Sequence, residues 1–450
     1  MQAQDAIEFV EAHVTVFRGQ TQYEGDTPVT VDDISPTQVD QIPTDFQAFL
    51  DKRSRRSGER KRRGIKLFGG SDAMPSDDHT LDFAHAYFDA DPVAEAFVKD
   101  AYIDGNPSHG RAMLDEALVH GIDSVANAPA SMVRLFEEFE KDPPWVDQDL
   151  VERGAFLFRR CGPAIFSFLG VSTLLAYTEN PIVQPLSMTG KYAGDAALNR
   201  FMETARFWID VSDPGGTKPG APGRATAMRV RIMHVFLRHR ITRHPQWHLA
   251  AWGKPINQAE ATITLLSGGY GAGLGMHKLG YRSTTADIEA MMHFWRYVGH
   301  LMGVQPRWYP ADLREAGQLM ALYFAKRAFG AGKDGRELIE SYPRAFTPKH
   351  RTGLRKVIRD QFNYRIQLGY TRYFLPGRFY RSYDMPDPWP WALLPPLQIP
   401  INLTIDLLAH ASPRIARLQD RFARWRRNTW FRNEMGDRDT HFKAAESFRK

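Results

Sequence analysis

Apolar residues recur at spacings of three and four along most of the chain after Asp78, which is the pattern of helices that bury one face. The pattern is clear in RAMLDEALVHG (111–121), SMVRLFEEFEKD (131–142), QDLVERGAFLFRR (148–160) and DAALNRFMETARFWIDV (195–211). No convincing run of alternating apolar and polar residues, the sign of a half-buried strand, interrupts them. The sequence therefore predicts an all-α fold.

Further helices are expected in the second half of the chain. Pro255 and Asn257 would open one of them, and Thr285 and Asp287 are the capping candidates of the next. The glycine-rich stretch between them lacks the G-x-G-x-x-G spacing of a dinucleotide loop, so its glycines indicate close packing of helix on helix. These helices are predicted over 227–243, 252–275, 284–303, 310–330 and 414–431.

Three regions differ in composition, and they predict how the chain is divided. Residues 1–77 are polar and would form a loosely ordered arm with a basic loop. Residues 78–383 would form the helical core. Residues 384–450 contain a Pro- and Trp-rich strap, DMPDPWPWALLPPLQIP (384–400), and C-terminal helices packed on the core. The alternative for the strap is a patch that contacts a membrane.

The composition limits the class of protein. A hydrophobic content of 43% in 450 residues is sufficient for a large buried core. The single cysteine, Cys161, excludes an intramolecular disulfide and a cysteine-rich metal site. The first residues lack the basic and apolar regions of a secretory signal. The longest apolar run, Gly162–Tyr177, has 16 residues, fewer than the roughly 20 that cross a bilayer. We therefore expect no transmembrane segment and a cytoplasmic location.

The net charge of +6 is concentrated in one short stretch. Lys52–Lys66, KRSRRSGERKRRGIK, contains nine lysines and arginines and one glutamate, so its charge of +8 leaves −2 for the rest of the chain. Such a loop could bind nucleic acid or anionic lipid, but no aromatic residue interrupts it to stack on bases. A solvated loop is the favoured interpretation, and a nucleic-acid partner is not expected.

The helix predicted over Ala227–Arg243 carries the most distinctive chemistry, because it places a histidine between two arginines. Residues three and four apart share a helix face, so Arg231, His234 and Arg238 project together. Burial and two positive neighbours both lower the pKa of a histidine, which keeps the imidazole neutral and able to act as a metal ligand or a base. The guanidiniums could hold carboxylates of a bound group, such as the two propionates of a haem. The alternative is a hydrogen-bonded core histidine with the arginines on the wet side of the helix.

The order and spacing of several segments between about Gly162 and Pro310 resemble the family of latex clearing protein, which also contains the fungal oxygenase of the mycophenolic acid pathway. The segments are R-x-x-x-T at Arg200 and Thr204, R-x-x-H-x-x-x-R through His234, WGKPINQ (252–258) and HFWRYVGHLMG (293–303). The resemblance implies a single large helical domain with a globin-like core that holds haem b. It also implies dioxygen-dependent cleavage of carbon–carbon double bonds in isoprenoid chains.

Roles for five residues follow from this resemblance. His234 would be the proximal ligand of the haem iron, with Arg231 and Arg238 as supporting residues that bind the cofactor. Arg200 and Thr204 would line the distal side. The helix geometry agrees, because a short Gly- and Pro-rich loop joins the two helices and makes them antiparallel neighbours.

Glu203 departs from the family pattern, because rubber-cleaving relatives carry a lysine just before this threonine. A carboxylate cannot act as the amine that caps the iron. It could instead take a proton from an allylic carbon of the substrate or hydrogen-bond bound oxygen, provided that burial raises its pKa. The alternative is a side chain that points to solvent. The family's distal glutamate has no evident equivalent, and by spacing its position falls near Gln184.

The functional hypothesis is a haem-dependent oxygenase that uses dioxygen on a hydrophobic small molecule, unsaturated or isoprenoid, with oxidative cleavage of a double bond. A substrate smaller than solid polyisoprene is expected, because no export signal is visible. Two alternatives stay open: a haem or lipid carrier without turnover, and a helical protein that binds nucleic acid or anionic membrane through Lys52–Lys66. The apolar walls of the substrate pocket are expected from Phe166, Phe168, Leu174 and Phe201.

Overall fold

Every regular element is helical in the residues that this computed structural model describes, which are 42–54, 74–188, 194–327, 329–348 and 353–435. The predicted all-α class is therefore confirmed, whereas its globin-like part stays a prediction. The α-helices are α2 (Thr44–Ser54), α4 (Asp77–His85), α5 (Pro92–Val98), α6 (Pro107–His120), α7 (Ala130–Glu140), α8 (Gln148–Arg159), α9 (Ala164–Ala176), α10 (Asn180–Met188), α11 (Gly194–Ser212), α12 (Pro222–Thr242), α13 (Leu249–Trp252), α14 (Gln258–Leu266), α15 (Ala272–Gly275), α16 (Thr285–Leu301), α17 (Leu313–Lys326), α18 (Gly332–Ala345), α19 (Leu354–Phe374), α20 (Gly377–Arg381), α21 (Leu394–Ala411) and α22 (Pro413–Met435).

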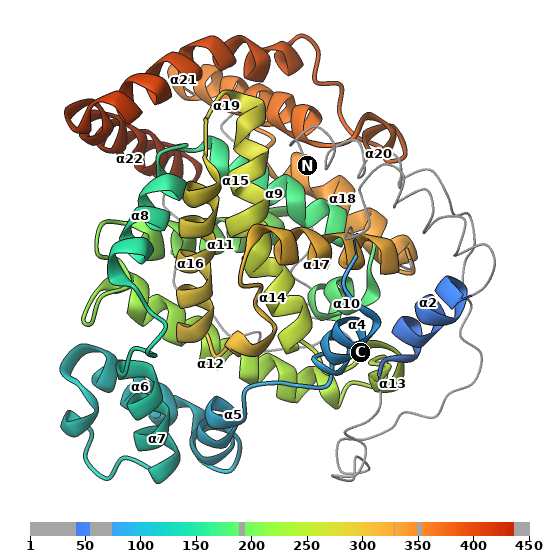
Figure 1. Cartoon of the computed structure of the whole chain (residues 1–450), viewed down its shortest axis with the longest axis vertical. Helices are drawn as coiled ribbons and strands as arrows, with labels where there is room; N and C mark the ends of the chain where they lie inside the picture. Colours follow the sequence, from blue (N-terminus) through green and yellow to red (C-terminus); the bar gives the residue numbers. More distant parts are fainter. Residues whose placement is uncertain (1–41, 55–73, 189–193, 328, 349–352, 436–450) are drawn as a thin grey trace.

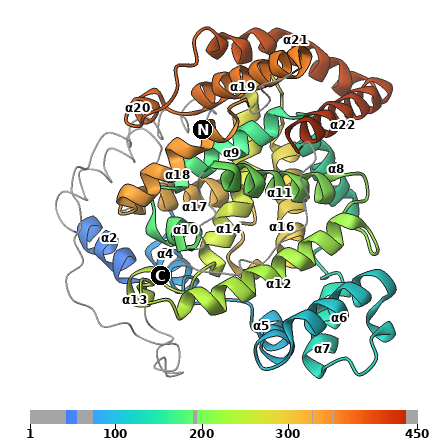
Figure 2. The ribbon, with the colours of Figure 1, turned by 180° about the vertical axis from the view of Figure 1, so that it is seen from behind.

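The helices form a central group with further helices at either end (Figure 1). α9, α11, α14, α16 and α17 lie in the middle, α5 to α7 lie at one end, and α19, α21 and α22 lie at the other. The view from behind shows α12 along the side of the central group, below α11 (Figure 2). Because α12 also packs against α5, it connects the centre of the molecule to the N-terminal helices.

Close packing at the centre depends on apolar and small residues. α9 is apolar on nearly all sides, which suits a helix surrounded by other helices. α8 crosses α16 at Gly154, where a β-carbon would lie 2.1 Å from the carbonyl oxygen of Ala290. Only glycine permits this approach, so a single residue allows the crossing.

Part of the predicted N-terminal arm is helical. α2 buries Phe46, whose ring packs edge-on against Tyr87 at a centroid distance of 5.9 Å. The prediction of a loosely ordered arm is therefore wrong for this segment, because one buried aromatic side chain helps to seat a short helix on the core. The basic stretch Lys52–Lys66 begins in α2, and its residues from 55 onward lie outside the described residues.

The stretch predicted as one helix over 252–275 is broken into several elements. α13 ends at Trp252, and α14 is followed by a π-helix, Ser267–Gly271, and by the short α15. A β-carbon on Gly268 would lie 2.6 Å from the ring of Trp295 on α16. The predicted close packing of these glycines is confirmed. The prediction of a single continuous helix is wrong, because the chain changes from an α-helix to a π-helix where the glycines pack against α16.

Two predicted helix starts are close to the observed ones. Asn257 caps α14 and accepts a hydrogen bond from the backbone nitrogen of Glu260 at 2.9 Å. Thr284, rather than the predicted Thr285, caps α16: its side chain accepts from the Asp287 backbone nitrogen, and the Asp287 side chain accepts from that of Thr284. This reciprocal pairing satisfies two backbone donors at the start of the helix.

The C-terminal strap is shorter than predicted. Residues 384–388 have no regular structure, but a 3₁₀ turn, Trp391–Leu393, leads directly into α21. Trp391–Ala411 has 21 residues and, by length and composition only, is apolar enough to cross a membrane. The expectation that the chain has no transmembrane segment stays a prediction. A search for an uninterrupted apolar run overlooks Trp391–Ala411, because polar residues are spaced along the helix.

Candidate functional site

α11 and α12 form a hairpin whose register is set near its connecting loop. The Thr226 hydroxyl on α12 donates to Asp210 Oδ2 on α11 at 3.2 Å. His234 lies about two turns further along α12. On α11, Glu203 lies about two turns before Asp210 on the same side of the helix, and Arg200 lies about one turn before Glu203. The hairpin therefore places His234 level with the residues predicted for the distal side.

His234 is half-buried, and its pKa is lowered to about 4. Burial is the main cause, and the charge of Arg238 is the second. Within the described part of the chain neither ring nitrogen has a hydrogen-bond or ion-pair partner, and neither is fully covered by other atoms. The hydrogen-bonded core histidine considered above is therefore not observed. A neutral imidazole with a reachable nitrogen can bind a metal or take up a proton.

Arg231 is engaged by carboxylates of its own chain. Its guanidinium binds both oxygens of Asp91, at 2.6 and 2.8 Å, and Glu138 at 2.7 Å. Burial lowers the pKa of Arg231, but the two carboxylates outweigh this effect and raise it overall. Nη1 alone is buried without a hydrogen-bond partner in the described residues. One donor is thus left for the predicted role of binding a cofactor.

Arg238 is held in a similar way. Its Nη1 lies 3.1 Å from a carboxylate oxygen of Glu95 on α5, and the guanidinium also donates to the carbonyls of Pro255 and Ile256 at 3.1 and 2.7 Å. Burial lowers the pKa of Arg238, with Glu95 acting against it. Together with Arg231, this side chain fastens α12 to the N-terminal helices. Its contact with a cofactor stays a prediction.

Arg200 is fixed by a residue that the sequence did not suggest. Its Nη2 donates to the Tyr177 hydroxyl at the end of α9, at 2.9 Å. Thr204, one turn along α11, donates its hydroxyl proton to the carbonyl of Arg200 at 3.0 Å. Thr173, one turn before Tyr177, is exposed although most of α9 is buried. Protein atoms therefore leave room on this side of α9.

Glu203 is half-buried. Its role as a proton acceptor stays a prediction, and so does the alternative of a side chain in solvent. Gln184, to which the family spacing pointed, is half-buried in α10. Five residues earlier, Glu179 is a buried carboxylate that lies 4.0 Å from Arg327 and accepts a hydrogen bond from the Phe329 backbone nitrogen. Sequence reasoning missed this carboxylate, because nothing near it in the chain predicts its burial.

Two of the four apolar residues expected to line a pocket are packed in the core instead. Phe166 stacks on Trp208 at a ring-centroid distance of 5.9 Å, and Leu174 has no exposed surface. Phe168 and Phe201 keep part of their surface exposed. These two are the remaining candidates for the wall of a substrate pocket.

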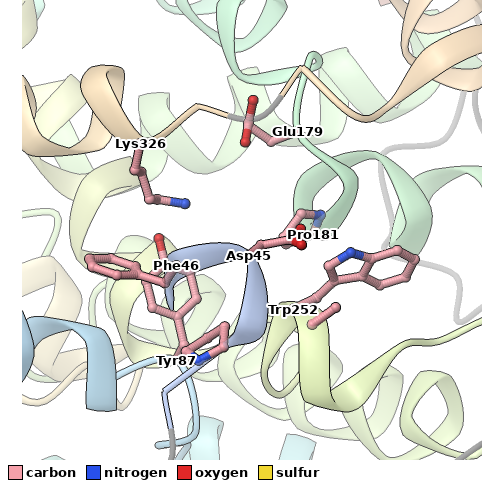
Figure 3. Close-up of a pocket in the computed structure, with 9 residues that line it drawn as sticks. Asp45, Phe46, Tyr87, Glu179, Pro181, Trp252 and Lys326 are labelled. Carbon is pink, nitrogen blue, oxygen red and sulfur yellow. The ribbon is translucent and has the colours of Figure 1, made fainter. Parts of the chain in front are cut away.

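A second polar group lies beneath α2, beside a small pocket lined by Tyr87, Trp252 and Lys326 (Figure 3). Lys326 Nζ is 3.5 Å from a carboxylate oxygen of Glu260 and 4.7 Å from the ring centre of Tyr87. Burial raises the pKa of Glu260, and Lys326 acts in the opposite direction. This buried pair joins α14 to α17 and balances its own charge, which is the arrangement of a structural contact.

The family model described as the ER-bound oxygenase mpaB/B'/Rubber oxygenase, catalytic domain, matches residues 159–397, more than half of the chain. The chain belongs to this oxygenase family. The matched region of this family member contains every residue given a role above: Arg200, Glu203, Thr204, Arg231, His234 and Arg238.

Two known proteins are similar to this oxygenase-family chain. The rubber oxygenase of Streptomyces sp. (strain K30) is 28% identical over 199 residues, which are 44% of this chain and 47% of that protein. The match thus spans about half the length of this curated relative. A structure of latex clearing protein LCP in the closed state has a TM-score of 0.53 at 20% identity, with 78% of this chain and 89% of that chain covered. At this identity the likeness shows a shared fold.

Proposed function

We propose that the protein is a haem b-dependent oxygenase that uses dioxygen to cleave a double bond in a small unsaturated or isoprenoid molecule. The observation that carries the proposal is a half-buried, neutral His234 that has no hydrogen-bond or ion-pair partner among the described residues and lies level with Arg200 on the facing helix. Family membership supports the oxygenase class. The name of the Streptomyces relative supports an isoprenoid substrate.

The residues of the site fit a haem. His234 would hold the iron, because a neutral imidazole with a reachable nitrogen is the common proximal ligand. The unpartnered Nη1 of Arg231 is the donor left to bind a propionate. Arg238, whose donors are used by Glu95 and two carbonyls, would hold α12 in place. When bound, the haem supplies an iron centre that activates dioxygen.

The chain's own residues would orient the reactants and move a proton. Tyr177 fixes the direction in which Arg200 donates. Thr204 gives its proton to a backbone carbonyl, so its oxygen is left to accept a hydrogen bond. Glu203 would take a proton from an allylic carbon of the substrate as a carboxylate base. The half-exposed aromatic side chains described above suit an apolar substrate.

Absorbance spectroscopy tests the cofactor. Protein purified from a haem-supplemented culture should show a Soret band, and His234→Ala should abolish it. His109→Ala removes an exposed histidine of α6 and is the matched control, which should keep the band. A colourless wild-type protein under these conditions would overturn the proposal.

Oxygen uptake tests turnover and separates an oxygenase from a haem or lipid carrier. Wild-type protein with squalene or a shorter isoprenoid alcohol should consume dioxygen. Glu203→Gln should keep the Soret band but lower the rate roughly a hundredfold if the carboxylate acts as a base. A red protein that consumes no dioxygen with either substrate would be a carrier.

A further inference from the structure

A surface helix of a soluble protein normally turns its apolar face to the core and its polar face to water. In α21 this arrangement is reversed. Gln398, Asn402 and Asp406 follow one another at four-residue spacing and face the core. Gln398 Oε1 accepts from the Tyr370 hydroxyl at 2.6 Å, and Asn402 Nδ2 donates to the Leu279 carbonyl at 2.9 Å. The inner face of α21 is thus its polar face.

Asp406 is the strongest of these anchors. It is fully buried, lies 3.2 Å from Arg160 Nη1 and accepts a hydrogen bond from the Arg282 backbone nitrogen at 2.7 Å. Beneath the helix, a β-carbon on Gly280 would lie 2.5 Å from the Ile399 carbonyl oxygen. These contacts hold α21 along its length and fix its rotation.

The outer face of α21 is apolar. Leu397, Ile401, Ile405 and Leu408 lie at spacings of three and four, and all are exposed, Leu397 to 67%. Only 17% of the apolar window in Trp391–Ala411 is buried. An exposed apolar stripe of this length marks a surface that contacts something other than water.

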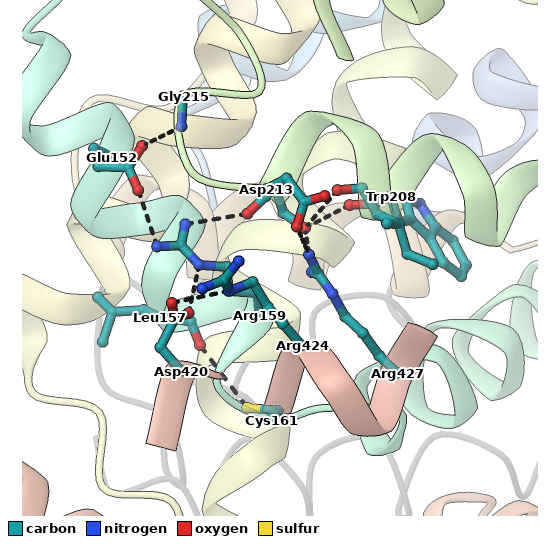
Figure 4. A network of polar contacts seen from close by, with 12 residues as sticks. Glu152, Leu157, Arg159, Cys161, Trp208, Asp213, Gly215, Asp420, Arg424 and Arg427 are labelled. Carbon is teal, nitrogen blue, oxygen red and sulfur yellow. Dashed lines mark hydrogen bonds and ion pairs between the residues drawn. The ribbon is translucent and has the colours of Figure 1, made fainter. Parts of the chain in front are cut away.

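α22 shows the same arrangement from its start to Arg427, with charged side chains toward the core and apolar side chains toward the outside. On the inner side Asp420 accepts from Arg159 Nε at 2.7 Å, and Arg427 Nη1 donates to the Ser212 hydroxyl at 2.9 Å (Figure 4). Charged residues again face the core as far as Arg427, whereas Phe431 and Met435, nearer the end of the helix, are buried in it. The exposed apolar residues of α22 are Leu418, Phe422 and Trp425.

The first half of α19 extends the same kind of surface. Leu354, Ile358 and Phe362 are exposed at four-residue spacing. The ring of Phe362 packs edge-on against Trp391, at 5.3 Å, so this stripe meets the start of α21. Figure 1 shows the three helices together at one end of the molecule. We call their exposed large apolar residues the outer apolar face: Leu354, Ile358, Phe362, Leu393, Leu397, Ile401, Ile405, Leu407, Leu408, Leu418, Phe422 and Trp425.

The exposed charges of α22, beside the outer apolar face, are positive. Arg414, Arg417, Arg421 and Arg426 are exposed on α22, between and beside its apolar residues. α21 contains no lysine or arginine, and no acidic residue of α21 or α22 is exposed. The face therefore combines an uncharged apolar centre with a row of cations at its border.

We propose that the outer apolar face docks on the surface of a bilayer that contains anionic lipid, with α21 in the plane of the interface. The apolar side chains would enter the boundary of the acyl chains, and the arginines would bind lipid phosphates. Trp389, which is exposed, and Trp425 would lie at the level of the headgroups, where tryptophan is favoured. This inference does not depend on the proposed cofactor.

A second copy of the chain fits this face less well than an anionic bilayer. A twofold interface would use the same face of both copies and so bring two rows of arginines into one interface, and neither α21 nor α22 offers an exposed acid to pair with them. Lipid phosphates supply the missing negative charge.

α21 is also unsuited to cross the membrane. Crossing would break the contacts of Gln398, Asn402 and Asp406 with the core and move a carboxylate into hydrocarbon. A helix that keeps these contacts can only lie along the interface.

Vesicle flotation with the full chain tests the proposal. Wild type should float with vesicles of phosphatidylcholine and phosphatidylserine, and Leu397→Asp/Ile401→Asp should lower the binding at least about tenfold. Arg417→Gln/Arg421→Gln should lower it about fivefold per arginine on these vesicles and have little effect on phosphatidylcholine alone. Val119→Asp is the matched control: Val119 is exposed to the same 67% on the distant α6, and the variant should float like wild type.

Three results would overturn the proposal. The first is a wild-type protein that stays with the soluble fraction for both lipid compositions, or aspartate variants that float as well as wild type. The second is a wild-type dimer in analytical ultracentrifugation that the aspartate variants convert to a monomer, which would assign the face to a second copy. The third is retention on the vesicles after an alkaline carbonate wash, which would mean that α21 spans the bilayer. Far-UV circular dichroism confirms that each variant is folded.

Discussion

α12 and α21 both turn charged or polar side chains toward the protein, yet they end with opposite surfaces. In α12 the arginines are paired with carboxylates of α5 and α7, and most apolar side chains of the helix are buried as well. In α21 the carboxylate of Asp406 is paired with Arg160, and the apolar side chains face outward. A buried ion pair therefore fixes the position of a helix. It does not determine whether the apolar side chains of that helix are buried or exposed.

The physical reason is the cost of desolvation. Moving two charges out of water costs about as much as their attraction returns, so a buried pair contributes little net stability but penalises every arrangement that leaves one partner alone. In α12 such pairs position the helix that carries His234. In α21 such a pair keeps the apolar side chains on the outside of the molecule. Four measurements test this comparison.

The largest effect is expected from Asp91→Ala. The substitution leaves buried Arg231 with only the partly exposed Glu138, and it removes the side chain that accepts from the Ala94 backbone nitrogen at the start of α5. The free energy of unfolding, measured with urea, should fall by about 3–5 kcal/mol. Asp115→Ala breaks an exposed pair with Arg229 and should cost less than about 1 kcal/mol. Equal losses would contradict the role of burial.

The second effect concerns the histidine of α12. The pKa of His234 is about 4 in the folded protein and 6.5 when unperturbed, so between these values the unfolded chain binds a proton that the folded chain does not. Stability should therefore rise from pH 4 to pH 6.5 and be lost as the pH falls through this window, by up to about 3 kcal/mol. Urea unfolding at pH 7 and pH 4.5, without added haem, should show this dependence in wild type and a smaller one in His234→Phe. Identical dependence in both would contradict a ring that the fold keeps neutral.

The third effect is expected from Asp406→Ala, which leaves Arg160 unpaired under α21. The loss should be about 2–3 kcal/mol, less than for Asp91→Ala, because α21 lies at the outside and can detach without unfolding the centre. Hydrogen exchange should accelerate in α21 and stay unchanged in α12. Thr404→Ala, on the exposed side of α21, is the control and should leave both helices protected. Uniform acceleration would show that the two regions unfold as one.

The smallest effect is expected from Leu397→Asp in the absence of lipid. Because this side chain is exposed, adding a charge should change the free energy of unfolding by no more than about 0.5 kcal/mol. Ile241→Val removes one methylene group from a fully buried position of α12 and should cost about 1 kcal/mol. If the aspartate were the more damaging of the two, Leu397 would be covered in solution by another part of the protein or by a second copy.

Most of the fold could be predicted because helix periodicity is a local property of the sequence. α6, α7 and α8 lie within a few residues of their predicted bounds, and the hairpin of α11 and α12 follows from its short loop. Prediction failed where packing decides the outcome, as at the π-helix beside Trp295 and at Phe46 in the expected arm.

The partners of the site residues could not be predicted. Arg231 and Asp91 are 140 positions apart in the chain, and no local pattern links them. Tyr177 precedes Arg200 by 23 positions and offers no signal beyond an ordinary aromatic residue at a helix end. The spacing around His234 could be recognised because it lies within one helix and resembles a known family.

The ion pairs of α12 also decide how small a working piece of this protein can be. The region matched by the family begins at residue 159, whereas Asp91, Glu95 and Glu138 lie before it. A fragment cut at that boundary would leave two buried arginines without their counter-charges, on the helix that carries His234. The N-terminal helices are therefore integral to the core, and a boundary drawn from sequence similarity alone would divide a unit that the charges hold together.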